Sequence, residues 1–379
     1  MSDDQSFVRE LPGSPNLEHL KKQAKSLLSL FRDGATDAVD LVTHFEREPD
    51  PDNFGLQDAQ RILARSYGFP SWVRLRERVI ITAIKNGDTQ QVASILASAN
   101  DVTKLIQTQI LDPNATNHAI GKGATLLQFA SFRPWKGENV AATLVAAGAP
   151  VDLHSACGMG MTDRIDEITK ADPSAVNQQV DTYFPIQYAI SAGNAESVRC
   201  MMQNGDDPNR DLKKVAYFGW EDDAVDQDYT PWKPIHMASL WGFNADRVPV
   251  AQTLAEHGAD LNAVSPLNGF KPIHLVTMPN RVDMIRFYLN AGVDVNSRTV
   301  ECRGFELPSE EDGSISGLAC TPLMVACGEG FIEATECLLE AGADVTARNS
   351  DGKTALDFAN RRFWKEHDAN YDAIIKLLS

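Results

Sequence analysis

The stretch TPLMVACGEGFIEATECLLEAGADVTARNSDGKTAL, residues 321–356, contains a pattern that recurs through most of the chain. It opens on Thr321 and Pro322, a pair suited to capping and starting a helix. A second apolar segment follows, and one helical side of it carries Ile332, Ala334, Cys337, Leu338 and Leu339. Gly342 then stands where a left-handed residue closes a helix. The stretch therefore predicts two short helices joined by a turn.

Both elements recur along the chain. The opening element returns as TLLQFAS from Thr125, FPIQYAIS from Phe184, KPIHMAS from Lys233, KPIHLVT from Lys271 and TALDFAN from Thr354. The closing element returns as LVAAGAPVD, MMQNGDDPN, LAEHGADLN and YLNAGVDVN. Residues Ala156 and Ala189 are 33 positions apart, whereas Ala189 and Ala238 are 49 apart. The basic unit is therefore 33 residues, with insertions near 101–122, 206–232 and 298–320.

A 33-residue helix–turn–helix unit that opens on KPIHMAS resembles the ankyrin repeat. The resemblance covers residues 79–379 and implies an all-α ankyrin-repeat solenoid of about seven to eight helix pairs with hairpin loops. In such an array each repeat contacts mainly its neighbours, so the apolar core grows by stacking. The resemblance also implies a binding scaffold that recognises a protein partner through its concave groove and its inserted loops.

Residues 1–78 follow a different pattern. Apolar residues at helical spacing, from Leu17 to Phe31, predict an amphipathic helix that starts near Ser14 and Pro15. A second helix is expected over 36–47, and two more around the turn at Gly68. The stretch DAQRILARSYGFPSWVRLRERV is similar to a helical module that precedes the repeats in bacterial ankyrin-type proteins. We expect these residues to form a helical cap module over the first repeat of the array, residues 79–379.

The composition excludes several classes of protein. The formal net charge is −17, which argues against general binding to nucleic acid or to an anionic membrane surface. No apolar run approaches the roughly 20 residues that span a bilayer. The polar start MSDDQSFVRE shows no export signal, so a cytoplasmic location is expected. Six scattered cysteines without CxxC pairs indicate reduced thiols.

Common catalytic and cofactor motifs are absent from the sequence, including HExxH, GxSxG and the phosphate-binding glycine loops. No His or Cys pair has metal-ligand spacing, so neither a metal nor a cofactor is expected. His154, His236 and His274 occupy equivalent positions of their repeats. The family resemblance implies that each ring ties the turn of one repeat to the next.

The irregular segments offer the candidate binding residues. The insertion near 206–232 is rich in aromatic residues, and the residues that end the first helices form an unusually apolar row. An apolar row beneath an aromatic loop suits a protein side-chain anchor or a small hydrophobic ligand. The candidate binding residues are Phe132, Arg133, Trp135, Met159, Tyr217, Trp220, Trp232, Leu240, Trp241 and Met278.

Two functions remain open from the sequence. The first is the non-catalytic scaffold for a protein partner. The second is a small-molecule binding protein, or a cofactor-independent enzyme with lyase or isomerase chemistry, whose aromatic pocket is formed by the inserted loops. In that second case the candidates for proton transfer are Asp222, Asp223, His236 and Tyr229. Whether the chain is an enzyme is therefore not decided by the sequence.

Overall fold

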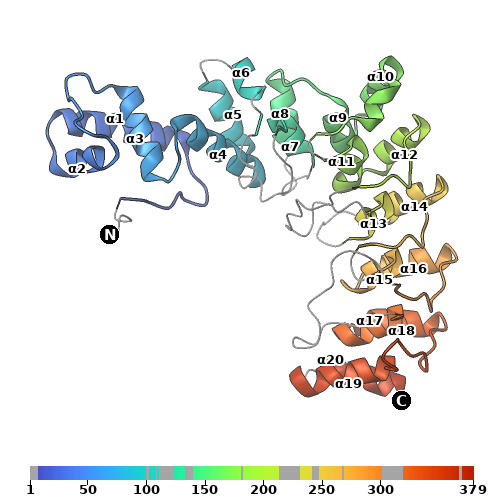
Figure 1. The fold of residues 1–379 in the computed structure, drawn as a ribbon. Helices are drawn as coiled ribbons and strands as arrows, with labels where there is room; N and C mark the ends of the chain where they lie inside the picture. Colours follow the sequence, from blue (N-terminus) through green and yellow to red (C-terminus); the bar gives the residue numbers. More distant parts are fainter. Residues whose placement is uncertain are drawn as a thin grey trace. The chain divides into compact units, whose positions relative to one another are not determined.

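The structure is a computed structural model. It describes residues 7–99, 102–107, 109–110, 123–132, 140–180, 182–212, 231–240, 247–266, 269–300, 319–366 and 369–379, without the side chains of 361–366. The described chain divides into two compact units, and Figure 1 shows the helices of each. The first comprises residues 7–150 apart from Ser131 and Phe132; the second comprises those two residues and 151–379.

The first unit contains eight described helices, and the first three form a small module. The helices of the unit are α1 (Leu17–Arg32), α2 (Thr36–Phe45), α3 (Leu56–Ser66), α4 (Trp72–Lys85), α5 (Thr89–Ala97), α6 (Val102–Ile106), α7 (Leu126–Phe132, whose last two residues belong to the second unit) and α8 (Val140–Ala146). Helix α1 begins two residues after the expected start, because the side chain of Asn16 accepts a hydrogen bond from the His19 amide and caps it. A core that includes Phe31, Val42 and Ile62 joins the first three helices.

Helix α4 connects this module to the helix pairs that follow. It packs against α3 on one side and α5 on the other, and its residues Val79, Ile80, Ile81 and Ile84 are fully buried. The expected boundary between residues 78 and 79 falls inside this single helix. The division into a cap module, 1–78, and an array, 79–379, stays a prediction.

The second unit is a stack of helix pairs. The pairs are α9 (Leu153–Met159) with α10 (Thr162–Ala171), α11 (Pro185–Ala192) with α12 (Ala195–Gln203), α13 (Pro234–Ser239) with α14 (Val248–Glu256), α15 (Pro272–Thr277) with α16 (Val282–Asn290), α17 (Pro322–Glu329) with α18 (Ile332–Glu340), and α19 (Ala355–Glu366) with α20 (Ala369–Leu378). A short 3₁₀ helix, Pro173–Asn177, follows α10. The first helices pack on one another in one layer and the second helices in another, which confirms the predicted all-α solenoid of helix pairs (Figure 1).

Small residues allow the first helices to approach closely. The aligned residues Ala156, Ala189, Ala238, Ala326 and Ala359 are at most 1% exposed. Gly160, Gly193 and Gly330 then end their helices in the left-handed conformation. Asn280 takes the same position after α15, at φ 58°, and its side-chain oxygen also accepts a hydrogen bond from the Ala334 amide at 3.2 Å. The 33-residue pattern therefore specifies both the packing surface and the helix ends.

Gly269 provides the first test of this stack. Its φ is +64°, and a Cβ added there would lie 1.7 Å from the carbonyl oxygen of Val300 in the neighbouring hairpin. The control is Gly292, which has φ +86° but no atom within 4 Å of an added Cβ. We expect Gly269→Ala to lower the free energy of unfolding in urea by about 2 kcal/mol more than Gly292→Ala. Equal losses would show that the close approach of the two hairpins does not stabilise the stack.

Candidate functional site

The hairpins before α11, α13 and α15 are locked by the side chain at the fourth position of the opening element. The Nδ1 atom of His236 accepts a hydrogen bond from the Lys233 amide at 3.0 Å, and that of His274 accepts one from the Lys271 amide at 3.2 Å. Where glutamine replaces histidine the bond remains, since the Gln187 oxygen accepts from the Phe184 amide at 2.9 Å. These bonds close the turns before α11, α13 and α15.

The other ring nitrogen reaches the next hairpin. The Nε2 atom of His236 donates to the Ala263 carbonyl oxygen at 2.9 Å, and that of His274 lies 3.1 Å from the Ser297 oxygen. His154 Nε2 lies 3.2 Å from the Tyr183 oxygen. The expected role of the three histidines in tying successive turns is confirmed. His236 has both nitrogens engaged by backbone and is fully buried, which leaves no ring nitrogen for a substrate.

Burial also changes the acid–base behaviour of these rings. Burial lowers the pKa of His236 and of His274 to about 4, from an ordinary value of 6.5. Burial likewise lowers the pKa of His154. All three rings are therefore neutral near pH 7, and each can donate from one nitrogen and accept at the other.

The candidate binding residues occupy different environments. Met159 and Met278, at the ends of α9 and α15, are half-buried and reach the surface. Phe132 is 1% exposed and meets the rings of Tyr183 and Tyr188 edge-on, with ring centroids 5.0 and 4.8 Å apart. Leu240 is also buried. Arg133, Trp135, Tyr217, Trp220, Asp222, Asp223, Tyr229 and Trp241 lie outside the described residues.

Trp232 lies at one end of the insertion near 206–232. Its ring is 6% exposed and packs edge-on against His236, with centroids 5.8 Å apart. The Leu212 amide donates to its carbonyl oxygen at 2.8 Å, and the Lys233 ammonium forms an ion pair with Asp211. The insertion therefore leaves and rejoins the hairpin at adjacent points. Trp232 as a contact residue for a ligand stays a prediction.

Two buried arginines in the second unit are not predictable from the sequence. Arg247, fully buried, donates to the carbonyl oxygens of Ile190 and Ser191, the latter at 3.0 Å, where α11 ends. A cation there complements the partial negative charge of the helix C-terminus. Arg210 forms a buried ion pair with Asp206. No sequence motif marks either group, because neither the repeat pattern nor local spacing shows which arginines become buried.

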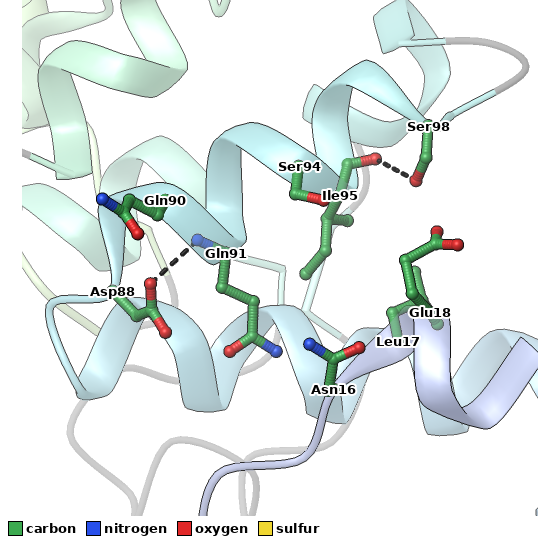
Figure 2. Close-up of a pocket in the computed structure, with 9 residues that line it drawn as sticks. All are labelled: Asn16, Leu17, Glu18, Asp88, Gln90, Gln91, Ser94, Ile95 and Ser98. Atoms are coloured by element: carbon green, nitrogen blue, oxygen red, sulfur yellow. Dashed lines mark hydrogen bonds between the residues drawn. The ribbon is translucent and has the colours of Figure 1, made fainter.

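The first unit contains a polar pocket of about 270 Å³ between α1 and α5, shown in Figure 2. It is lined by Asn16, Leu17, Glu18, Asp88, Gln90, Gln91, Ser94, Ile95 and Ser98. Asp88 accepts a hydrogen bond from the Gln91 amide at 2.8 Å and so caps α5. The Lys21 ammonium donates to a carboxylate oxygen of Glu18 at 2.8 Å and to the hydroxyl oxygen of Ser98 at 3.1 Å. The side-chain amide of Gln91 donates to the Pro15 carbonyl oxygen. These bonds hold α1 against α5, so helix packing alone explains why polar side chains line the pocket.

Within the ranges that the structure describes, no three His, Cys, Asp or Glu side chains gather in a way that could hold a metal ion. None of the described helices combines the length and apolar character needed to cross a membrane. The five described cysteines are all buried free thiols. Burial raises the pKa of Cys200 and of Cys327 to about 12, so both stay protonated at neutral pH.

Stacked helix pairs with side-chain-locked hairpins define a repeat protein, the class to which this chain belongs. Comparison with protein families identifies the repeat. Residues 235–287 match the model described as ankyrin repeats (many copies), and residues 320–350 match the model for the ankyrin repeat. The chain therefore contains ankyrin repeats, and the predicted resemblance is confirmed to that extent.

Similar proteins carry ankyrin repeats as well. Human ankyrin repeat and SOCS box protein 6 is 33% identical over 108 residues, 28% of this chain and 22% of that protein. Zebrafish (Danio rerio) ankyrin repeat and SOCS box protein 11 is 31% identical over 128 residues, 34% of this chain and 36% of that protein. Ankyrin repeat protein nuc-2 of Neurospora crassa is 24% identical over 300 residues, 78% of this chain and 24% of that protein.

The chain thus spans less than two fifths of the length of each of these relatives. All three come from eukaryotes, so the comparisons give no support to the bacterial-type part of the expected resemblance.

Proposed function

We propose that the chain is a scaffold that binds a protein partner along the hairpins and first-helix ends of its second unit. The observation that carries the proposal is the regular stack α9–α20, in which backbone hydrogen bonds to His236, His274 and Gln187 fix three of the hairpins relative to the helices that follow them. A rigid, repeating surface loses little conformational entropy on binding, which favours affinity for an extended protein segment. The related proteins are also named for their ankyrin repeats.

Met159 and Met278 are the described residues that we propose as contacts. Both are only half-buried and lie at the ends of first helices. Methionine is flexible and polarisable, so it packs well against varied partner side chains. We further propose that the partner contacts Trp241 and the segment near 206–232, and that residues 1–78 cap the array. Burial of Val79, Ile80 and Ile84 between α3 and α5 supports the capping role.

Site-specific photo-crosslinking tests the proposal. A photoreactive amino acid at Met278 is compared with the same amino acid at Arg286, an exposed position on the second helix α16. We expect a cell extract to yield a discrete protein adduct from Met278 and none from Arg286. The captured protein is then produced, and its Kd is measured for the wild type and for Met278→Lys.

The expected result is that Met278→Lys raises Kd by about tenfold or more, because a charge replaces an apolar contact at the interface. Arg286→Gln is the control and should leave Kd within about twofold. Adducts of equal yield from both positions, or a Kd that Met278→Lys does not change, would contradict binding at this surface.

A further inference from the structure

The cations of the second unit fall into two groups. Every described arginine or lysine on its second helices forms an ion pair: Arg164, Lys170, Arg199, Arg286 and Lys376. The hairpins are mixed. Lys233 and Arg210 form ion pairs with Asp211 and Asp206. Among the described residues, Lys271, Arg298, Arg348 and Lys353 form no ion pair, and they lie on the hairpins of consecutive repeats. The same hairpins carry the exposed carboxylates Asp260, Asp294, Asp344 and Asp351, so these cations lack a direct ion-pair partner among the described residues without making the hairpins positive overall.

Arg298 and Arg348 are equivalent residues. They end the sequences DVNSR, 294–298, and DVTAR, 344–348, and the 50 positions between them match the spacing of the aligned Val276 and Ala326. The Asp344 amide donates to the side-chain oxygen of Asn296 at 2.8 Å, which places one turn directly on the next. The two arginines are therefore separated by one step of the stack.

Both guanidinium groups are held in the same way. Nη1 of Arg298 donates to the carbonyl oxygens of Ala319 at 2.9 Å and of Arg348 at 2.7 Å. Nη1 of Arg348 donates to the Gly352 oxygen at 2.7 Å. Both residues are exposed, and among the described residues their Nε and Nη2 atoms have no hydrogen-bond partner. The Nε–Nη2 edge is the one that binds a carboxylate in bidentate fashion, and anchoring through Nη1 orients it in advance.

We infer that Arg298 and Arg348 bind two carboxylates of an acidic segment of the partner protein. This inference rests on the proposed function, because it specifies the chemistry of the partner at the same hairpins. Packed helices lie about 8–10 Å apart, so consecutive repeats present the two guanidinium groups at roughly that interval. An extended chain advances about 3.3–3.6 Å per residue, so acidic residues at positions i and i+3 match the interval.

Neighbouring charges are compatible with such a partner. Lys271 lies on the turn before that of Arg298, and Lys353 lies on the same hairpin as Arg348. Among the described residues, the Lys271 ammonium bonds only the hydroxyl of Ser297, at 3.3 Å. Asp344 interacts electrostatically with Arg298, and Asp357 with Arg348 and Lys353. Both carboxylates are exposed, so solvent screens their effect on an incoming acidic segment.

A labelled peptide tests the inference with the full chain. The probe is a 12-residue Gly/Ser peptide with glutamates at i and i+3, and its control carries glutamines at the same positions. By fluorescence anisotropy we expect the glutamate peptide to bind about tenfold more tightly. Arg298→Gln with Arg348→Gln should abolish this preference, and Arg298→Lys with Arg348→Lys should lose most of it, because lysine keeps the charge without the bidentate edge. Arg286→Gln removes one charge from a second helix and should leave the preference unchanged.

Equal binding of the two peptides, or equal losses in the hairpin and Arg286 variants, would overturn the inference. The two proposals also fail separately. A partner that cross-links at Met278 but binds the double glutamine variant as tightly as the wild type would overturn the inference alone. Arginine-dependent peptide binding without cross-linking from Met278 would overturn the proposed surface alone.

Discussion

Lowering the pH from 7.5 to 5.0 is expected to reduce the free energy of unfolding of the wild type by about 4 kcal/mol more than that of the His236→Gln, His274→Gln variant. Both rings are fully buried, and burial lowers the pKa of each to about 4 in the folded chain. In the unfolded chain each returns to its ordinary pKa of 6.5. Between these values the unfolded chain binds more protons than the folded chain.

The sign of the effect follows from this difference. The stability that the neutral rings contribute is fully present above pH 6.5 and is lost as the pH falls toward 4. Each pH unit below 6.5 lowers the free energy of unfolding by about 1.4 kcal/mol per histidine. At pH 5.0 the loss is therefore about 2 kcal/mol for each of the two histidines. In the neutral rings Nδ1 accepts a backbone hydrogen bond, from the Lys233 amide in His236 and from the Lys271 amide in His274. Protonation of Nδ1 would remove this acceptor and break both bonds.

Glutamine is the matched replacement because the chain already uses it at this position. The Gln187 oxygen accepts the Phe184 amide at 2.9 Å, and the Gln128 oxygen accepts the Thr125 amide at 2.8 Å, so the substitution keeps the bond that closes the turn. Urea unfolding of both proteins at pH 7.5, 6.5, 5.5 and 5.0 gives the comparison. Parallel curves of stability against pH would show that the two rings do not titrate on unfolding. All other titrating groups contribute equally to both proteins and cancel.

The repeat pattern predicts the fold well because each unit encodes its own boundaries. The Pro at the start of a first helix, the small residue Ala326 and the closing Gly342 each act within one unit, so sequence spacing is enough to place them. Asn280 shows a limit of the pattern. It replaces the glycine that ends α9, α11 and α17, yet it adopts the same left-handed conformation and adds bonds to the next repeat.

The binding residues are predicted less well, because exposure depends on neighbouring repeats. Phe132 and Met159 end equivalent first helices, but Tyr183 and Tyr188 cover the first of them. The sequence shows the same apolar character at both positions and does not show which neighbour is large. The sequence also cannot predict the free Nε–Nη2 edges of Arg298 and Arg348, because only the structure shows which nitrogens donate to backbone oxygens.

Buried ion pairs are the least predictable feature, and Asp206 with Arg210 is the clearest case. Asp206 is 6% exposed and Arg210 9%, and the guanidinium carbon lies 4.3 Å from the ring centroid of Phe184. Burial raises the pKa of Asp206 to about 6, although Arg210 opposes the shift. One carboxylate oxygen of Asp206, Oδ2, is buried and has no hydrogen-bond partner among the described residues, which is consistent with that direction. The folded chain therefore holds a proton on Asp206 more readily than the unfolded chain does.

Removing either partner of this pair is expected to destabilise the chain strongly. Asp206→Ala leaves a buried cation and Arg210→Met leaves a buried anion, and each should lower the free energy of unfolding at pH 7.5 by about 3–5 kcal/mol. The double variant leaves neither charge, and Met retains contact with Phe184, so it should recover most of the loss. Urea unfolding of the four proteins forms a double-mutant cycle. Losses that simply add would show that the two charges do not interact.

The pH dependence of the same cycle separates the two single variants. The folded pKa of Asp206, about 6, lies above its ordinary value of 3.8, so the stability due to its protonation is present below pH 3.8 and is lost as the pH rises through 6. Without Arg210 that pKa rises further, because the buried carboxylate loses its cation. Between pH 7.5 and pH 5.0, the free energy of unfolding of Arg210→Met should therefore recover by about 1 kcal/mol or more relative to that of the wild type. Asp206→Ala should show no such recovery, because it has no carboxyl group to protonate. Recovery of both variants, or of neither, would mean that Asp206 does not titrate in this range and that the pair is held by packing alone.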